Sequence, residues 1–259
     1  MRVAGLQLDL TWEDRTSNFA RVDRWLEAAV AADARLVVLP EMFPCGFTMN
    51  TTAVAEPFDG PSAEFLASRA QRHDLWLAGS APERADGADA DARPANVFLV
   101  AAPDGTLRRY AKIHPFTYAD EHSHYRPGDR RVVIDIDGLR CGLFVCYDLR
   151  FANHFWELAE QADAYLVVAS WPEPRRRHWT TLLTARAIEN QAYVVGINRV
   201  GEGGGLRYTG DSLILDPMGS TLAAGAEQET MLLADLDPGE AARVRRELPF
   251  QPDRRTDVR

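Results

Sequence analysis

The stretch VVIDIDGLRCGLFVCYDLRF, residues 132–151, carries the signals that decide the fold of this 259-residue chain. Its two apolar runs flank Asp137-Gly138, a dipeptide typical of a tight β-hairpin turn. The second run ends at Cys146, and the amphipathic segment ANHFWELAEQAD follows at 152–163. A hairpin that leads into a helix predicts a sheet with both antiparallel and parallel neighbours, covered by helices.

Helices and strands alternate on both sides of this stretch, which extends the same architecture along the chain. We predict further helices at 18–34 (capped by Thr16 or Ser17), 61–74, 178–191 and 238–248. Strands are predicted at 2–10, within 35–42 where Pro40 stops the strand, and at 75–83, 164–172 and 192–200, with two more hairpins at 96–113 and 212–225. The remaining stretches are predicted to be a polar loop at 84–94, a flexible glycine-rich loop at 201–205 and an exposed tail at 251–259.

No repeat, low-complexity tract or linker interrupts this order. We therefore predict an α/β fold with mixed sheets, in a single domain that spans residues 1–259 and has its core in about 1–240. Residues 241–259 contain the end of the last helix and the tail, and we expect them to reach a partner subunit.

A formal net charge of −9 argues against a protein that binds nucleic acid or anionic membranes, since both need clustered Lys and Arg. The dense basic run PRRRHW, at 174–179, is too short for such a patch and is predicted to be a solvated face. No apolar run approaches a membrane span, and the N-terminus resembles a first strand rather than a signal peptide. Three cysteines without a CxxC motif indicate a reducing compartment, so we expect a cytoplasmic protein.

Glu41, Lys112 and Cys146 each stand just past the end of an apolar strand, where sites form in layered α/β folds. Taken singly, each has an ordinary explanation: a carboxylate at a helix N-terminus, a solvated hairpin end and a packed thiol. Together they form a chemical set, because a thiol attacks only as thiolate and needs a base and a positive neighbour.

Glu41 can take the thiol proton, and Lys112 can stabilise both the thiolate and the oxyanion of a tetrahedral intermediate. The backbone N–H of Tyr147, at the start of the next helix, is a second candidate oxyanion donor. No serine stands in a GxSxG motif, so a serine hydrolase would lack its nucleophile.

The stretches LPEMF around Glu41, YAKIHPF around Lys112 and GLFVCYDLRF around Cys146 resemble the nitrilase (carbon–nitrogen hydrolase) superfamily, in its Glu–Lys–Cys order. The resemblance covers nearly the whole chain, and within the superfamily ADEHSHYRPGD (119–129) and residues 170–201 look most like bacterial omega-amidases. It implies a four-layer α-β-β-α sandwich, a homodimer or higher homo-oligomer, and no metal or organic cofactor. The implied reaction is hydrolysis of the amide of 2-oxo-acid monoamides such as 2-oxoglutaramate.

Three further residues are candidates for the site. The resemblance assigns to Glu121 the support of Lys112 and of substrate positioning, with the adjacent Asp120 as the alternative. Arg150 can offer a bidentate fork to a substrate carboxylate, or can form an internal salt bridge with Asp148 or Glu157. Trp171 ends the strand after the cysteine and is predicted to wall the pocket, with plain core packing as its alternative.

His114, His122 and His124, together with the carboxylates at 120 and 121, suggest a metal site. No further ligand motif such as HExxH occurs, so we predict no metal. Cys45 and Cys141 lack a charged set of their own and are predicted to be packed.

The sequence thus predicts a thiol amidase that acts on a small-molecule amide through a cysteine thioester. An N-carbamoyl amino acid amidohydrolase is the nearest alternative, because the same three residues serve it. Two alternatives belong to other classes: a catalytically silent binding or scaffold protein, and a redox-sensing thiol protein. The full Glu–Lys–Cys set argues against the first, and against the other we note that no resolving cysteine is evident near Cys146 in the sequence.

Overall fold

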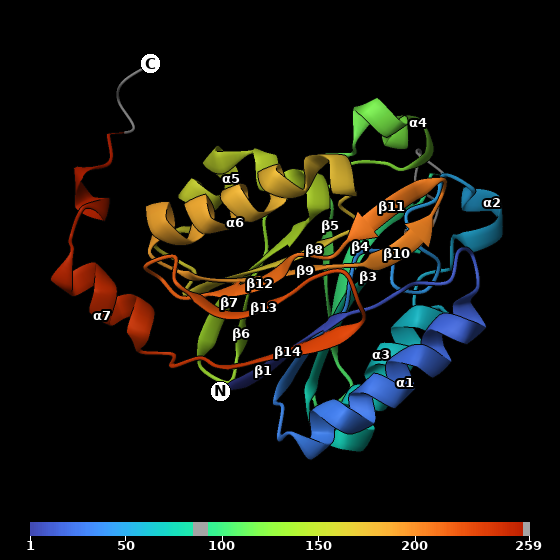
Figure 1. The fold of residues 1–259 in the computed structure, drawn as a ribbon, viewed down its shortest axis with the longest axis horizontal. Coiled ribbons are helices and arrows are strands. Elements are labelled where there is room, and N and C mark those ends of the chain that lie inside the picture. Colours follow the sequence, from blue (N-terminus) through green and yellow to red (C-terminus); the bar gives the residue numbers. More distant parts are fainter. Residues whose placement is uncertain (85–92, 256–259) are drawn as a thin grey trace.

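Two six-stranded sheets pack face to face in the computed structural model, which describes residues 1–84 and 93–255 (Figure 1). In spatial order the first sheet holds β14 (Thr230–Asp235), β1 (Arg2–Gln7), β2 (Leu36–Val38), β3 (Trp76–Glu83), β4 (Ala95–Ala101) and β5 (Leu107–Ala111). The second holds β13 (Thr221–Gly225), β12 (Ser212–Leu215), β9 (Tyr193–Asn198), β8 (Ala164–Ala169), β7 (Leu139–Val145) and β6 (Val133–Ile136).

Helices cover the outer face of each sheet, so the layers run α-β-β-α (Figure 1). The first sheet is covered by α1 (Arg15–Ala31) and α3 (Pro61–His73), and the second by α5 (Ala152–Leu158) and α6 (Arg176–Asn190). Neighbouring residues of one strand alternate between layers: Leu166 and Val168 join the core between the sheets, whereas Val167 packs under α5 and α6. Strands buried on both faces read as continuous apolar runs, as these do.

The predicted mixed character of the sheets is confirmed. β7, β8 and β9 run parallel, as do β1, β2 and β3, while hairpins add antiparallel strands outside them. The turn between β6 and β7 has positive φ at Asp137 (50°) and Gly138 (87°), the geometry that its dipeptide favours. The hairpin of β12 and β13 also forms where it was predicted.

Several element boundaries differ from the prediction. Helix α1 begins at Arg15 and is capped by Asp14, which accepts the Ser17 N–H at 3.0 Å, so Thr16 and Ser17 are not the caps. Helix α5 ends at Leu158 rather than near residue 163. Strand β14 had no sequence prediction; it closes the first sheet beside β1.

The residues predicted to be a flexible glycine-rich loop instead form a hairpin of β10 (Val200–Gly203) and β11 (Leu206–Thr209). Gly204 and Gly205 make its turn with positive φ, and a side chain on Gly204 would meet the Trp12 ring at 2.7 Å. Glycine serves here for close approach rather than for flexibility.

The C-terminal end leaves the sheets as α7 (Glu240–Glu247), which lies at the side of the molecule (Figure 1). Gln251 donates to the Asn190 carbonyl at 2.6 Å, and the Arg254 guanidinium lies over the Trp156 ring at 3.9 Å. The prediction of a simply exposed tail is therefore wrong for these residues, because both side chains find partners on α5 and α6. The last four residues, and most of the polar loop predicted at 84–94, lie outside the described residues.

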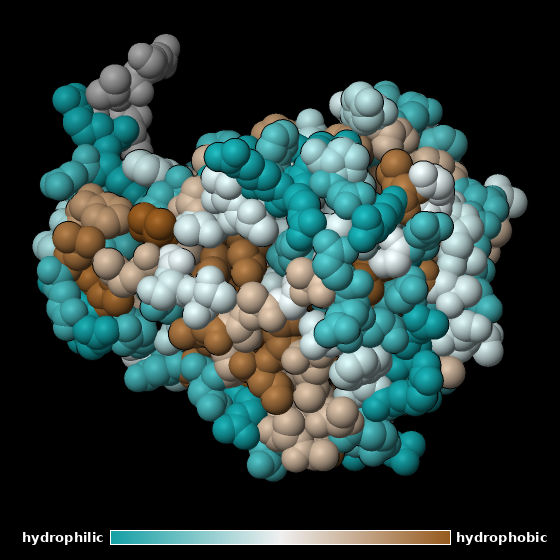
Figure 2. All heavy atoms as spheres, in the orientation of Figure 1, coloured by the Kyte–Doolittle hydropathy of each residue, from teal (hydrophilic) through white to brown (hydrophobic). Residues whose placement is uncertain are grey.

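Five of the exposed large apolar side chains belong to α6, the β12–β13 turn, β13, β14 and the segment after α7 (Ile188, Met218, Leu222, Leu233 and Leu248). Figure 2 shows apolar surface over this part of the molecule. Within residues 1–84 and 93–255, no helix combines the length and apolar character that crossing a membrane requires.

Candidate active site

Glu41, Lys112 and Cys146 meet at one end of the sandwich, although they come from different strands. Glu41 follows β2, Lys112 follows β5 and Cys146 follows β7, so both sheets contribute. Lys112 Nζ lies 3.0 Å from Glu41 Oε1, and the Cys146 thiol is close enough to both for their charges to act on its pKa. The structure therefore brings together the base, cation and thiol that the sequence singled out.

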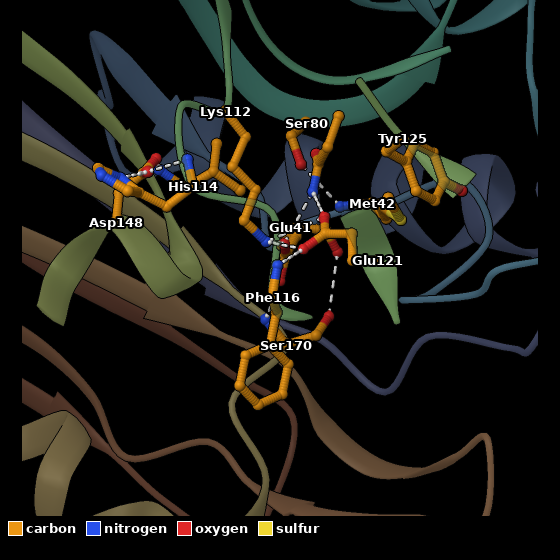
Figure 3. A network of polar contacts seen from close by, with 12 residues as sticks. Glu41, Met42, Ser80, Lys112, His114, Phe116, Glu121, Tyr125, Asp148 and Ser170 are labelled. Atoms are coloured by element: carbon orange, nitrogen blue, oxygen red, sulfur yellow. Dashed lines mark hydrogen bonds and ion pairs between the residues drawn. The ribbon is translucent and has the colours of Figure 1, made fainter. Parts of the chain in front are cut away.

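Glu121 completes the buried charge cluster from α4 (Glu121–His124). Its two carboxylate oxygens accept from Lys112 Nζ at 2.8 and 3.1 Å (Figure 3), and both glutamates are fully buried. Burial by itself would lower the pKa of Lys112, but the charges of Glu121 and Glu41 outweigh it and raise that pKa. The lysine is thus held as a cation between two carboxylates. Asp120, the alternative to Glu121, lies outside this cluster; it is 3.7 Å from His122 Nδ1 and 3.6 Å from His124 Nε2, and it accepts a hydrogen bond from Ser123 Oγ at 2.6 Å.

Two further groups fix the Glu41 carboxylate. Asn96, at the start of β4, donates to Glu41 Oε1 at 2.8 Å. The N–H of Ser170, labelled in Figure 3, donates to Oε2 at the same distance. The sequence analysis missed both residues. A signal for Asn96 existed, because it is the one amide in the buried run ANVFLVA, and buried polar groups are almost always hydrogen-bonded.

Cys146 stands at a sharp turn between β7 and a short 3₁₀ helix, Cys146–Arg150. Its φ of +47° lies in the left-handed region, which non-glycine residues adopt rarely. Burial and the negative charge of Glu41 raise the pKa of the thiol, while Lys112 pulls it down. The sulfur therefore rests protonated against its base. Tyr147 N–H lies in the first turn of this helix, where N–H groups have no partner within the helix.

Asp148, also missed by the sequence analysis, ties this turn to the strand that carries Lys112. Its Oδ2 accepts from Val145 N–H at 3.0 Å and Tyr110 O–H at 2.7 Å. Its Oδ1 accepts from His114 N–H at 3.0 Å and lies 2.8 Å from His114 Nδ1. Tyr110 and His114 are the residues two before and two after Lys112, so one carboxylate holds the lysine and cysteine segments in register. His114 is thereby occupied, and the described residues contain no group of three or more side chains suited to a metal.

Comparison with known proteins shows which family this chain belongs to. Residues 2–246 match the family model for carbon–nitrogen hydrolases. The chain belongs to the carbon–nitrogen hydrolase family. It is 40% identical to the omega-amidase YafV of Escherichia coli K12, over 98% of this chain and 96% of that one. It is 31% identical to the 2-oxoglutaramate amidase of Bacillus subtilis, over 99% and 98%.

A solved structure gives the same family and fold. A carbon–nitrogen hydrolase superfamily protein of Xanthomonas campestris, with an arsenic adduct in its active site, superposes with a TM-score of 0.92 at 34% identity, covering 100% of this chain and 98% of that one. The predicted α-β-β-α fold of the nitrilase type is thus confirmed.

The candidate site of this carbon–nitrogen hydrolase borders a cavity of about 260 Å³. Cys146 and Ser170 form part of its wall, and the almost fully buried Lys112 has its Nζ 5.2 Å from the ring centre of Phe47, another lining residue. The remaining lining is largely aromatic (Trp12, Phe47, Phe116, Tyr147, Trp171 and Tyr208). A largely apolar lining lowers the local dielectric constant, which strengthens electrostatic interactions inside the cavity.

Arg150 and Trp171 both line this cavity. The Arg150 guanidinium lies 4.7 Å from the centre of the Trp171 ring and 3.4 Å from His178 Nδ1. Neither salt bridge considered for Arg150 forms, because Asp148 is occupied as described and Glu157 pairs with Arg131. Trp171 is only 3% exposed, so it serves both as core and as pocket wall. Cys45 and Cys141 are buried among apolar side chains, as predicted.

Proposed function

We propose that this carbon–nitrogen hydrolase is a thiol amidase that releases ammonia from omega-amidated 2-oxo-dicarboxylates such as 2-oxoglutaramate. The observation that carries the proposal is the grouping of Cys146 with the ion pair of Glu41 and Lys112, against a cavity that Cys146 and two arginines line. The names of the E. coli and B. subtilis relatives support the substrate class.

In the first half of the reaction, Cys146 Sγ attacks the amide carbonyl carbon while its proton passes to Glu41. The oxyanion that forms is stabilised by Lys112 and the Tyr147 N–H. Glu41 then returns the proton to the amide nitrogen, the C–N bond breaks, and ammonia leaves a thioester on Cys146. The strained turn at Cys146 supports this step, because it holds the sulfur at the cavity wall.

In the second half, Glu41 takes a proton from water, whose oxygen attacks the thioester carbonyl carbon. The oxyanion again meets Lys112, the C–S bond breaks, and the sulfur recovers its proton from Glu41. Glu121 touches no reacting atom in this scheme. It keeps Lys112 charged and in place, for which its two contacts with Nζ are the support.

One assay tests the proposal against its alternatives. Ammonia release is measured over 2-oxoglutaramate, 2-oxosuccinamate, glutamine, an N-carbamoyl amino acid and a simple nitrile, with Cys146→Ala as blank. We expect 2-oxoglutaramate or its shorter homologue to lead. Carbon dioxide released with ammonia from the carbamoyl compound at a higher rate would favour the amidohydrolase, and no ammonia from any compound would favour a silent scaffold.

We further propose that the protein is a homodimer or a higher homo-oligomer in a reducing, cytoplasmic setting. The row of exposed apolar side chains along β13, β14 and the end of α6 supports self-association, since contiguous exposed apolar surface marks interfaces. The predicted contact of the tail with a partner subunit belongs to the same proposal. Light scattering coupled to size exclusion measures the mass; a monomer at micromolar concentration would refute it.

A further inference from the structure

We propose that Arg175 and Arg150 form a two-guanidinium subsite, and that Arg175 makes the enzyme select a substrate with a 2-oxo-carboxylate end over one with a 2-amino group. The identity of the substrate rests on the function proposed above. The subsite itself rests on the charges that line the cavity, and nothing in the sequence singled out Arg175.

Both guanidinium groups line the same cavity as Cys146, and neither is neutralised by the protein. Across residues 1–84 and 93–255, no carboxylate forms an ion pair with Arg150 or Arg175. The next residue along the chain shows the contrast: Arg176 pairs with Asp211 at 2.6 Å and with Glu227 at 3.1 Å. Carboxylates are therefore available nearby, yet the two cavity-lining arginines have none.

Aromatic rings hold both arginines in position. The Arg175 guanidinium lies 5.4 Å from the Phe116 ring centre and 6.0 Å from that of Tyr118. Trp171 links the pair, because its ring lies under Arg150 and its Nε1 donates to the Arg175 carbonyl at 2.8 Å. Stacking on aromatic faces leaves the N–H groups at the edge of each guanidinium free to donate to a ligand.

The two positive charges also act on one another. Burial lowers the pKa of Arg150, and the nearby positive charge of Arg175 lowers it further. Two like charges in a mainly apolar, half-enclosed cavity are unfavourable until an anion arrives between them. The free energy stored in this repulsion is released when a carboxylate binds, so it contributes to affinity.

The ligand that suits two forks carries several acceptor oxygens close together. A 2-oxo-carboxylate offers two carboxylate oxygens and an adjacent carbonyl oxygen, all of them acceptors for N–H donors. A 2-amino acid carries an ammonium group at the same carbon, which has no acceptor and is repelled by both arginines. Selection thus comes from attraction of one substrate and repulsion of the other.

The test compares Arg175→Gln with Arg177→Gln, which removes the same charge two residues further on, from an exposed site outside the cavity. Initial rates are measured on 2-oxoglutaramate, on glutamine, and on glutaramate, which lacks the 2-oxo group. A charge-assisted hydrogen bond is worth enough that Arg175→Gln should lower kcat/KM on 2-oxoglutaramate about tenfold or more. The preference for 2-oxoglutaramate over glutamine should fall with it, while Arg177→Gln leaves both values unchanged.

Binding gives a readout that does not need turnover. Isothermal titration of 2-oxoglutarate into Cys146→Ala should show binding that weakens with added salt, and about tenfold or more weakening when Arg175→Gln is added. Arg175→Lys, which keeps the charge without the fork, should be intermediate. A variant that loses secondary structure by circular dichroism is replaced by Arg175→Met in the same comparison.

The two proposals fail separately. If no amide yields ammonia but 2-oxoglutarate binds and depends on Arg175, the subsite stands and the proposed reaction falls. If 2-oxoglutaramate is hydrolysed and Arg175→Gln behaves like Arg177→Gln in both assays, the reaction stands and the subsite is overturned.

Discussion

Two parts of the site handle positive charge in opposite ways: Cys146 with the buried cluster of Glu41, Lys112 and Glu121, which we call the floor, and the two arginines of the cavity lining, which we call the mouth. On the floor, Lys112 meets Glu121 at 2.8 Å and Glu41 at 3.0 Å, and it is almost fully buried. At the mouth, Arg150 and Arg175 face aromatic rings and no carboxylate of the described chain. A charge that the protein itself neutralises can do its work before any ligand arrives, whereas an unneutralised charge depends on a ligand to complete it. The floor is therefore built for chemistry and the mouth for recognition.

The largest effect should follow from removing the nucleophile on the floor. Cys146→Ala should lower kcat on the order of 10⁴-fold or more, because the thioester can no longer form. The melting temperature should stay close to that of the wild type, since the methyl group fits the space. Mass spectrometry during turnover should find the acyl adduct on Cys146; an adduct on Cys45 or Cys141, or residual turnover in the variant, would contradict the assignment.

The second-largest effect should follow from Lys112→Ala, which should lower both kcat and the free energy of unfolding. Removing an oxyanion donor lowers kcat by about a hundredfold or more. It also leaves two buried carboxylates unpaired, which costs about 3 kcal/mol or more of unfolding free energy. Urea denaturation and steady-state kinetics measure the two losses. Arg140→Ala is the control. It removes an arginine from a partly exposed ion pair with Asp163 and should leave kcat unchanged.

Asp148→Asn should shift the segment that carries Cys146 relative to the segment that carries Lys112, although Asp148 contacts no reacting atom. The amide group places a donor where Tyr110, Val145 or His114 also donates, so the turn shifts relative to Lys112. A misplacement of this kind costs on the order of tenfold to a hundredfold in kcat. Asp163→Asn, also at a buried aspartate, is the control; equal losses in the two variants would mean that Asp148 contributes only stability.

At the mouth, Arg150→Ala should act mainly on binding. Its partner carboxylate belongs to the substrate in the ground state, so KM should rise about tenfold with a smaller change in kcat. The preference for a free acid over its ester should shrink as well. If the acid-over-ester preference is unchanged while kcat falls as in Lys112→Ala, the division between floor and mouth is wrong.

The smallest effect concerns the pH dependence of the resting thiol. Burial has the largest effect and raises the pKa of the Cys146 thiol. The negative charge of Glu41 raises it further, and the positive charge of Lys112 lowers it. Glu41→Gln removes the charge and retains Lys112, so the thiol pKa should fall and the thiolate fraction at neutral pH should rise. Alkylation by iodoacetamide should then shift to lower pH by a measurable amount, although hydrolysis is lost. An unchanged profile, or a shift to higher pH, would show that Glu41 does not control the proton.

Much of the floor could be predicted because its residues stand at strand ends, in positions that a sequence pattern marks. Asn96 and Asp148 could not be found in this way, since each is a single polar residue whose partner is fixed only when distant strands pair. The run Arg175-Arg176-Arg177 shows the limit most clearly. It was predicted to be one solvated face, yet one arginine lines the cavity, one forms ion pairs and one is exposed. The chain changes from a 3₁₀ turn to α6 between Arg175 and Arg176, so consecutive side chains point in different directions. The amino-acid composition of the run does not predict where this change falls.

The glycine-rich hairpin of β10 and β11 makes a related point. The sequence suggested mobility, because glycine loses more conformational freedom than any other residue when it is ordered. In the structure Gly203 and Gly204 instead let the hairpin lie against Trp12, and its residues Leu206 and Tyr208 reach the cavity. Whether a glycine-rich stretch is flexible or closely packed depends on the residue it packs against, here Trp12, and the local sequence does not show that residue.

The protonated state of Cys146 also bears on how long the enzyme survives in a cell. Peroxides attack thiolates rather than thiols, and over-oxidation to sulfinic or sulfonic acid is irreversible for most proteins. Because the resting sulfur keeps its proton beside Glu41, we expect the idle enzyme to resist oxidants that would destroy a permanently ionised cysteine. Exposure to damage is then confined to the moments of turnover, when a substrate already fills the cavity and shields the sulfur.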